Sequence, residues 1–161
     1  MERTRLQRFI ELKTRKDKKQ QIATVDCDTD AMLEQLADET INDSQLLSVI
    51  DSMLTELVFR QENLGIKHYS IKITSEYLYD KLRNIGHGCT PYAAKMLNPS
   101  VQSLKMTLKS KFPQAQLLPD DAFYELTPLF YEVLMRKLTK KINDAGYQAK
   151  YHPFLDYIKV K

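Results

Sequence analysis

Few residues of this chain stand at spacings that metal sites use. Asp26, Asp28 and Asp30 occupy the first, third and fifth positions of a calcium-binding loop pattern. The pattern then fails, because Ala31 stands where the loop needs a glycine and Ala37 where it needs a bidentate glutamate. This spacing therefore favours an acidic loop over a calcium site.

A second candidate is the pair His87 and Cys89, two soft ligands that the sequence places in a turn. A closed zinc site needs four ligands, and no second pair stands at ligand spacing. Cys27, His68 or His152 would have to complete it from distant segments. We therefore expect no metal and no cofactor.

Enzyme motifs are also missing from the sequence. There is no Gly-rich phosphate loop and no Gly-x-Ser-x-Gly nucleophile turn. His68 falls on the polar face of an expected strand and His152 in a turn beside Pro153, so both are expected to be solvent-exposed. We predict no catalytic residues and no enzymatic activity.

The formal net charge of +3 hides three blocks of opposite sign. Residues 1–19 hold eight Lys or Arg and three acids, and residues 20–59 hold nine acids and no Lys or Arg. Residues 60–161 hold sixteen bases and nine acids. Such blocks indicate surfaces for different electrostatic partners, one block folded against another, or solvated faces.

The basic arm at residues 1–19 is the most specific candidate site, for a protein partner or for nucleic acid. Eight cations in nineteen residues can contact phosphates and make affinity steeply salt-dependent. The same arm could instead lie on the acidic block of its own chain or of a neighbour. The candidate binding residues are Arg3, Arg5, Arg8, Lys13, Arg15, Lys16, Lys18 and Lys19.

Aromatic residues are concentrated at residues 123–131 and 147–157. Interleaved with Lys150, Lys159 and Lys161, those of the second segment could form a stacking platform for single-stranded nucleic acid. The alternative, which we favour, is that they pack a sheet against helices. The residues concerned are Tyr147, Tyr151, Phe154 and Tyr157.

Hydrophobic periodicity predicts the elements that position these residues. A wide apolar stripe predicts a helix at 44–62, and alternation predicts a half-buried strand at 67–73. Ser75 and Ser100 are expected to cap helices, a short helix is expected at 91–97, and a last helix is broken or restarted at Pro128. The C-terminal segment 147–160 reads as a β-hairpin.

These elements predict an α+β fold, a mostly helical single domain with a small sheet of about three strands, strand 67–73 plus the hairpin 147–160. We divide the chain into a basic N-terminal arm at 1–19, an acidic linker at 20–42 and an α+β domain at 43–161. The arm is expected to be helical over 3–19. Within the linker we expect one short helix around Met32, Leu33 and Leu36.

Three segments together resemble a group of viral proteins. They are the strand region 65–71, the helix that runs through Leu134 and Leu138 to Gly146-Tyr147, and the last strand at 156–160. This arrangement resembles small accessory and structural proteins of tailed phages and large DNA viruses. The resemblance implies a virion or assembly component, or a host-directed binding protein, and it implies no catalytic residues.

The leading hypothesis is a non-enzymatic structural or assembly component, such as a viral or phage virion protein, that docks through its basic N-terminal arm onto other subunits. The alternative is a nucleic-acid-binding regulatory protein that uses the arm and the basic C-terminal half.

No window approaches the roughly 18 apolar residues of a membrane span, and no apolar segment follows the first residues. We therefore expect no membrane partner and an intracellular, cytoplasmic location, or the virion if the protein is viral.

Overall fold

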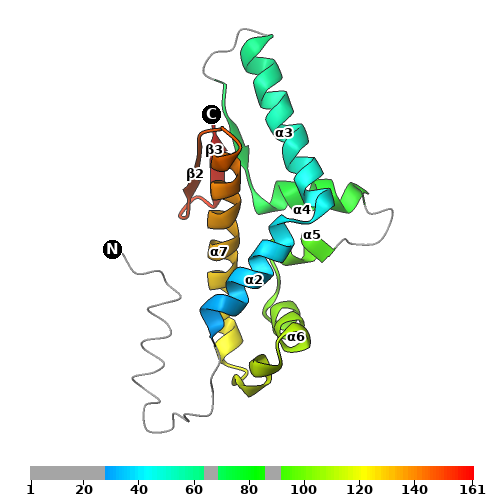
Figure 1. The fold of residues 1–161 in the computed structure, drawn as a ribbon, viewed down its shortest axis with the longest axis vertical. Helices are drawn as coiled ribbons and strands as arrows, with labels where there is room; N and C mark the ends of the chain where they lie inside the picture. The colour runs from blue at the N-terminus through cyan, green and yellow to red at the C-terminus, as the bar shows by residue number, and fades with distance from the viewer. Residues whose placement is uncertain (1–27, 64–68, 86–91) are drawn as a thin grey trace.

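The computed structural model describes residues 28–63, 69–85 and 92–161. Within these ranges the chain forms six α-helices, one short 3-10 helix and a sheet of three strands (Figure 1). The predicted α+β class is confirmed. In chain order the elements are α2 (Thr29–Ile41), α3 (Ser44–Glu62), β1 (Ile71–Ile73), α4 (Ser75–Ile85), α5 (Tyr92–Leu97), α6 (Val101–Lys111), η1 (Pro113–Leu117), α7 (Ala122–Asp144), β2 (Ala149–His152) and β3 (Tyr157–Val160).

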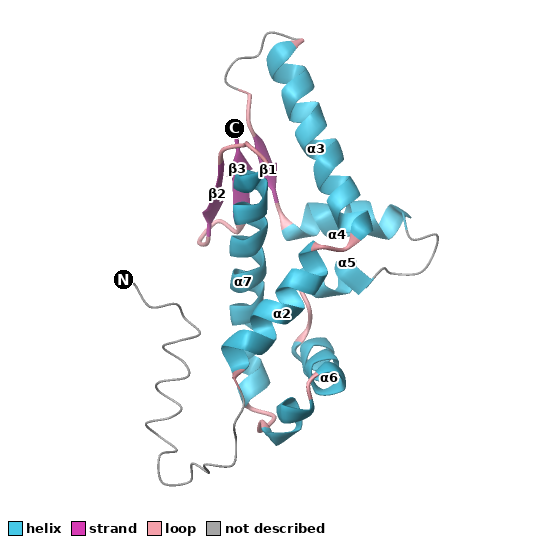
Figure 2. Cartoon of the chain, in the orientation of Figure 1, coloured by secondary structure: helices cyan, strands magenta, loops and turns pink. Residues whose placement is uncertain are grey.

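Helix α7 is the central element of the core. Its buried stripe follows helical spacing, with Phe130 and Leu134 fully enclosed near its middle. Helix α2 packs across it, α6 packs beside its first half, and the hairpin β2–β3 packs against its second half (Figure 2). One hydrophobic core therefore joins segments from both ends of the described chain.

The acidic segment at 20–42 contains the helix expected around Met32, Leu33 and Leu36, but the described part is a longer core helix and not a linker. Residues Thr29–Ile41 form a helix of 13 residues, and its Met32, Leu33 and Leu36 are buried against the core. The segment is polar overall because only one face of α2 is apolar, and that face lies on α7. The core thus begins well before residue 43.

The helix predicted at 44–62 is confirmed with those bounds. Asp43 precedes it, and its carboxylate accepts hydrogen bonds from the backbone N–H groups of Gln45 and Leu46 at 2.9 and 3.1 Å. Ser100 likewise caps α6 by accepting from Ser103 N–H at 3.1 Å. The cap expected at Ser75 is supplied instead by Thr74, whose hydroxyl accepts from Tyr77 N–H, because Ser75 is itself buried in the first turn.

The break predicted at Pro128 is absent, since α7 runs without interruption from Ala122 to Asp144. Proline cannot donate to the carbonyl one turn earlier. The first two turns are held instead by the burial of Phe123 and Leu126 and by the hydroxyl of Thr127, which donates to the Phe123 carbonyl at 2.7 Å. Packing therefore overrides the local breaking tendency of the proline.

The three strands form one antiparallel sheet in the order β1-β3-β2. Ile71 pairs with Val160, and Val160 in turn pairs with Ala149. Ile73 and Ile158, which pair with each other, are fully buried, so this side of the sheet faces the core. The hairpin predicted at 147–160 is confirmed, with a turn at 153–156 in which Asp156 has a φ of 59°. In the described residues no helix has the length and apolar character needed to cross a membrane.

Candidate functional site

The eight cations predicted as the binding site, Arg3 to Lys19, lie outside the described residues, as do Cys27, His68, His87 and Cys89. Two of the three aspartates at calcium-loop spacing, Asp28 and Asp30, lie within the described residues. Asp28 is the N-cap of α2, and its carboxylate accepts from Ala31 N–H at 3.1 Å. Partial burial, and then the neighbouring charges of Asp28 and Glu34, raise the pKa of Asp30. Across the described ranges no three His, Cys, Asp or Glu side chains gather closely enough to hold a metal ion.

A row of three lysines crosses the outer face of the sheet. The strand register places Lys72 of β1 directly opposite Lys159 of β3, and Lys159 directly opposite Lys150 of β2. Their neighbours along each strand face the core, as successive residues of a strand point to opposite sides. We call Lys72, Lys150 and Lys159 the lysine row. Neighbouring strands lie about 4.8 Å apart, so the row spans about 10 Å.

Lys161 extends the cationic face beyond the row. It follows Lys159 by two residues, and its backbone N–H donates to the Gln148 carbonyl at 2.9 Å, which continues the pairing of the hairpin. Alternation therefore places its side chain on the same face as Lys159. Lys161 is exposed and Lys159 is half-buried.

Aromatic side chains lie next to the lysine row on the same face. The ammonium group of Lys72 lies over the ring of Tyr157, 4.8 Å from its centroid. The rings of Tyr157 and His152 stack with centroids 4.8 Å apart and an interplanar angle of 29°. Beyond them, Phe154 in the hairpin turn is 100% exposed and Leu155 is 70% exposed.

The aromatic residues of the hairpin lie on two faces, and each of the two interpretations holds for part of them. Tyr147 and Tyr151 pack against the core, as the favoured interpretation predicts. Phe154 and Tyr157 do not follow it, because Phe154 is fully exposed and Tyr157 lies under Lys72 on the outer face. His152, expected to be solvent-exposed in a turn, is instead half-buried at the end of β2, where it stacks on Tyr157.

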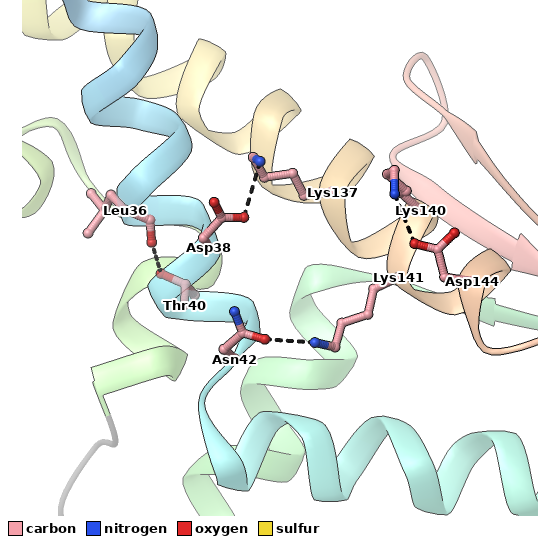
Figure 3. A network of polar contacts seen from close by, with 8 residues as sticks. All are labelled: Leu36, Asp38, Thr40, Asn42, Lys137, Lys140, Lys141 and Asp144. Atoms are coloured by element: carbon pink, nitrogen blue, oxygen red, sulfur yellow. Dashed lines mark hydrogen bonds and ion pairs between the residues drawn. The ribbon is translucent and has the colours of Figure 1, made fainter.

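The acidic block neutralises lysines on other helices rather than those of the sheet. Asp38 of α2 pairs with Lys137 of α7 at 3.1 Å (Figure 3). Glu39 pairs with Lys111 of α6 at 2.7 Å. The hydrogen bond from Lys111 lowers the pKa of Glu39 below its ordinary value. One charge block of the sequence therefore does fold against another.

The cations without such partners are gathered near the sheet. Among the described residues, the Lys and Arg side chains that make neither an ion pair nor a side-chain hydrogen bond are Lys72, Lys81, Arg83, Lys95, Lys150, Lys159 and Lys161. All but Arg83 and Lys95 lie on the outer face of the sheet or in the cleft beside β1. This arrangement concentrates uncompensated positive charge on one face of the fold.

Part of this candidate site can be predicted from the sequence. The alternation Ile71-Lys72-Ile73 and Tyr157-Ile158-Lys159-Val160 indicates which lysines face outward. It does not indicate that the strand order is β1-β3-β2, which brings residues 72, 159 and 150 into one line.

Comparisons of the chain with models of protein families, with curated protein sequences and with solved structures found no match. The likeness to viral accessory proteins stays a prediction.

Proposed function

We propose that this protein binds nucleic acid through the outer face of its sheet. The observation that supports the proposal is the lysine row: three ammonium groups in register across adjacent strands, with no carboxylate partner among the described residues. Phosphate contacts by lysines supply most of the sequence-independent affinity of proteins for nucleic acid.

The charge arrangement favours a polyanion over a small anion. The three ammonium groups of the row are spread over about 10 Å instead of converging on one point. A chain of phosphates can contact such a row at successive positions, whereas a single phosphate can contact one end of it. Lys161 adds a fourth cation on the same face.

The aromatic groups support the same ligand class. Tyr157, His152 and the fully exposed Phe154 lie at the hairpin-turn end of the face. Bases stack on aromatic rings whatever their sequence, so a face that combines lysines with aromatic rings suits nucleic acid. An exposed phenylalanine is otherwise unfavourable in water.

The assembly role, the leading hypothesis from the sequence, depends on the arm at residues 1–19, which lies outside the described residues. It stays a prediction. The basic C-terminal half, which the alternative hypothesis invokes, contains Lys150, Lys159 and Lys161. The geometry of the sheet therefore favours the alternative.

The test is binding of the full-length chain to fluorescein-labelled oligonucleotides, measured by fluorescence anisotropy across a salt series. Four phosphate contacts on a single strand predict a slope of log affinity against log salt of about −3, so affinity falls about 50-fold between about 50 and 200 mM salt. Lys159→Glu, at the centre of the row, should weaken binding about tenfold at the lower salt and reduce the magnitude of the slope by about 1.

Lys95→Glu is the matched control. Lys95 is exposed on α5, makes no ion pair among the described residues, and gives the same change in net charge. Both variants retain residues 1–19, so any contribution of the arm is common to them. Equal losses in the two variants, or no binding to any oligonucleotide at the lower salt, contradict the proposal.

A further inference from the structure

A cleft of about 840 Å³ lies between α3, β1 and α4. We call it the α3–α4 cleft. One wall is a stripe of α3 at spacing i, i+4, i+8 and i+12, from Ser48 to Arg60. This stripe is about 18 Å long at 1.5 Å per residue. The opposite wall is formed by Lys72 on β1 and by Tyr77 and Lys81 on α4. The cleft is therefore elongated, as a site for a linear ligand would be.

The charge of the cleft is positive. It is lined by Arg60, Lys72 and Lys81, and the carboxylate among its described lining residues is that of Glu56. Glu56 already accepts a hydrogen bond from Arg60 at 2.7 Å. Lys72 and Lys81 face no carboxylate within ion-pairing distance in the described ranges. Both lysines are thus available to an anionic ligand.

Aromatic rings accompany these cations. Lys81 lies over the ring of Tyr77 at 5.4 Å, and Arg60 lies over the ring of Tyr69 at 5.3 Å. Tyr77 is 41% exposed. The cleft therefore repeats the combination of cation and ring that the outer face of the sheet presents.

The cleft is continuous with that face. A second hollow of about 840 Å³ shares Tyr69 and Ser70 with the cleft, and it is lined on its far side by Lys159 and Lys161. Lys72 belongs both to the cleft and to the lysine row. A path lined by cations therefore leads from the sheet, past Tyr69, into the α3–α4 cleft.

We propose that the ligand is single-stranded nucleic acid and that it runs along this path, with Lys81 contacting a phosphate and a base stacking on Tyr77 in the α3–α4 cleft. This inference rests on the proposed function. The cleft favours a single strand because its rings need base faces to stack on. In a duplex those faces are covered by neighbouring base pairs, whereas in a single strand they are accessible.

The experiment compares two variants in the cleft with Lys159→Glu in the full-length chain. The probes are a labelled twelve-nucleotide oligothymidylate, its oligouridylate counterpart and a twelve-base-pair duplex, at low salt. Tyr77→Ala should weaken binding to the single strands about tenfold, since stacking on one ring contributes on that scale. Lys81→Glu, which changes an exposed side chain, should weaken it by a similar factor. The duplex should bind at least tenfold more weakly than the single strands.

Matched controls are Tyr124→Ala and Lys95→Glu. Tyr124 is 70% exposed near the start of α7, and neither it nor Lys95 lines the path. Both control variants should bind as the parent chain does. An unchanged circular dichroism spectrum and thermal midpoint in Tyr77→Ala establishes that its loss of binding is not a loss of fold.

The outcomes separate the two proposals. If Lys159→Glu weakens binding while Tyr77→Ala and Lys81→Glu leave it unchanged, the path through the cleft is wrong and the sheet proposal stands. Equal affinity for duplex and single strand also overturns the path. If no probe binds at low salt, both proposals are wrong.

Discussion

Helix α2 offers the sharpest test of the packing, because its sequence reads as an acidic linker and its structure is a core helix. Leu36 lies in the middle of α2 and is 0% exposed. Truncation to alanine removes its buried methyl groups and leaves a cavity in the hydrophobic core. Burial of one leucine contributes about 2 kcal/mol, and the cavity adds to that loss. Leu36→Ala should therefore lower the free energy of unfolding by about 3 kcal/mol.

The assay is urea denaturation followed by circular dichroism at neutral pH. A loss of about 3 kcal/mol is a large share of the 5–15 kcal/mol typical of a domain, and it should lower the thermal midpoint by about 9 °C in a chain of this length. Leu117→Ala is the matched control, because the same substitution is made at a side chain that is 54% exposed in η1. Leu117→Ala should lower the free energy of unfolding by less than about 0.5 kcal/mol.

Burial of Leu36 in the core is refuted if Leu36→Ala lowers the free energy of unfolding no more than Leu117→Ala does. A flexible linker would give that result, because a leucine already in contact with water loses little on truncation. An intermediate value of about 1 kcal/mol with an unchanged dependence on urea would instead indicate that the neighbouring Leu33 and Met32 relax into the cavity.

Two further predictions concern single polar groups. Asp43→Ala removes the acceptor for the N–H groups of Gln45 and Leu46, and it should lower the free energy of unfolding by about 1 kcal/mol in the same urea assay, while Asp43→Asn should restore most of it. Glu39→Gln should lower stability by about 0.5 kcal/mol at neutral pH, since an ion pair this exposed contributes little. The pKa of Glu39 is lower in the folded chain, so its contribution is present above the unfolded pKa and is lost as the pH falls through the folded pKa. The two thermal midpoints should therefore converge once the pH has fallen below the folded pKa of Glu39, and a difference that persists there contradicts the assignment.

The sequence predicts an element well where a wide apolar stripe and a local cap agree. Helix α3 spans the residues that its wide apolar stripe predicts, and in the structure Asp43 caps its start. The hairpin is also predictable, because alternation in β3 and the turn residues before it are local signals. These features depend on residues a few positions apart.

Other features depend on partners far along the chain. Asp38 and Glu39 make α2 look like a solvated segment until Lys137 and Lys111, each more than seventy residues away, are placed beside them. The helix around Pro128 is stabilised by packing that no local rule contains. The same reason explains the candidate site: alternation identifies outward lysines, whereas the strand order that aligns them is a tertiary property.

The distribution of charge connects the fold with the proposed ligand. The acids of α2 lie beside lysines of α6 and α7, and Asp120 lies 2.8 Å from Lys105 of α6, so these helical lysines have acidic partners. The sheet has no acidic element packed on its outer face in the described structure, and its lysines keep their charge uncompensated.

Placing an acidic side chain on that face tests directly whether the uncompensated charge drives binding. Gln148→Glu, at the hollow lined by Lys159 and Lys161, should weaken binding to a single strand as a cation loss does, although no lysine is removed. Because Gln148 is exposed, the fold should be unaffected, and the salt dependence of binding should become shallower.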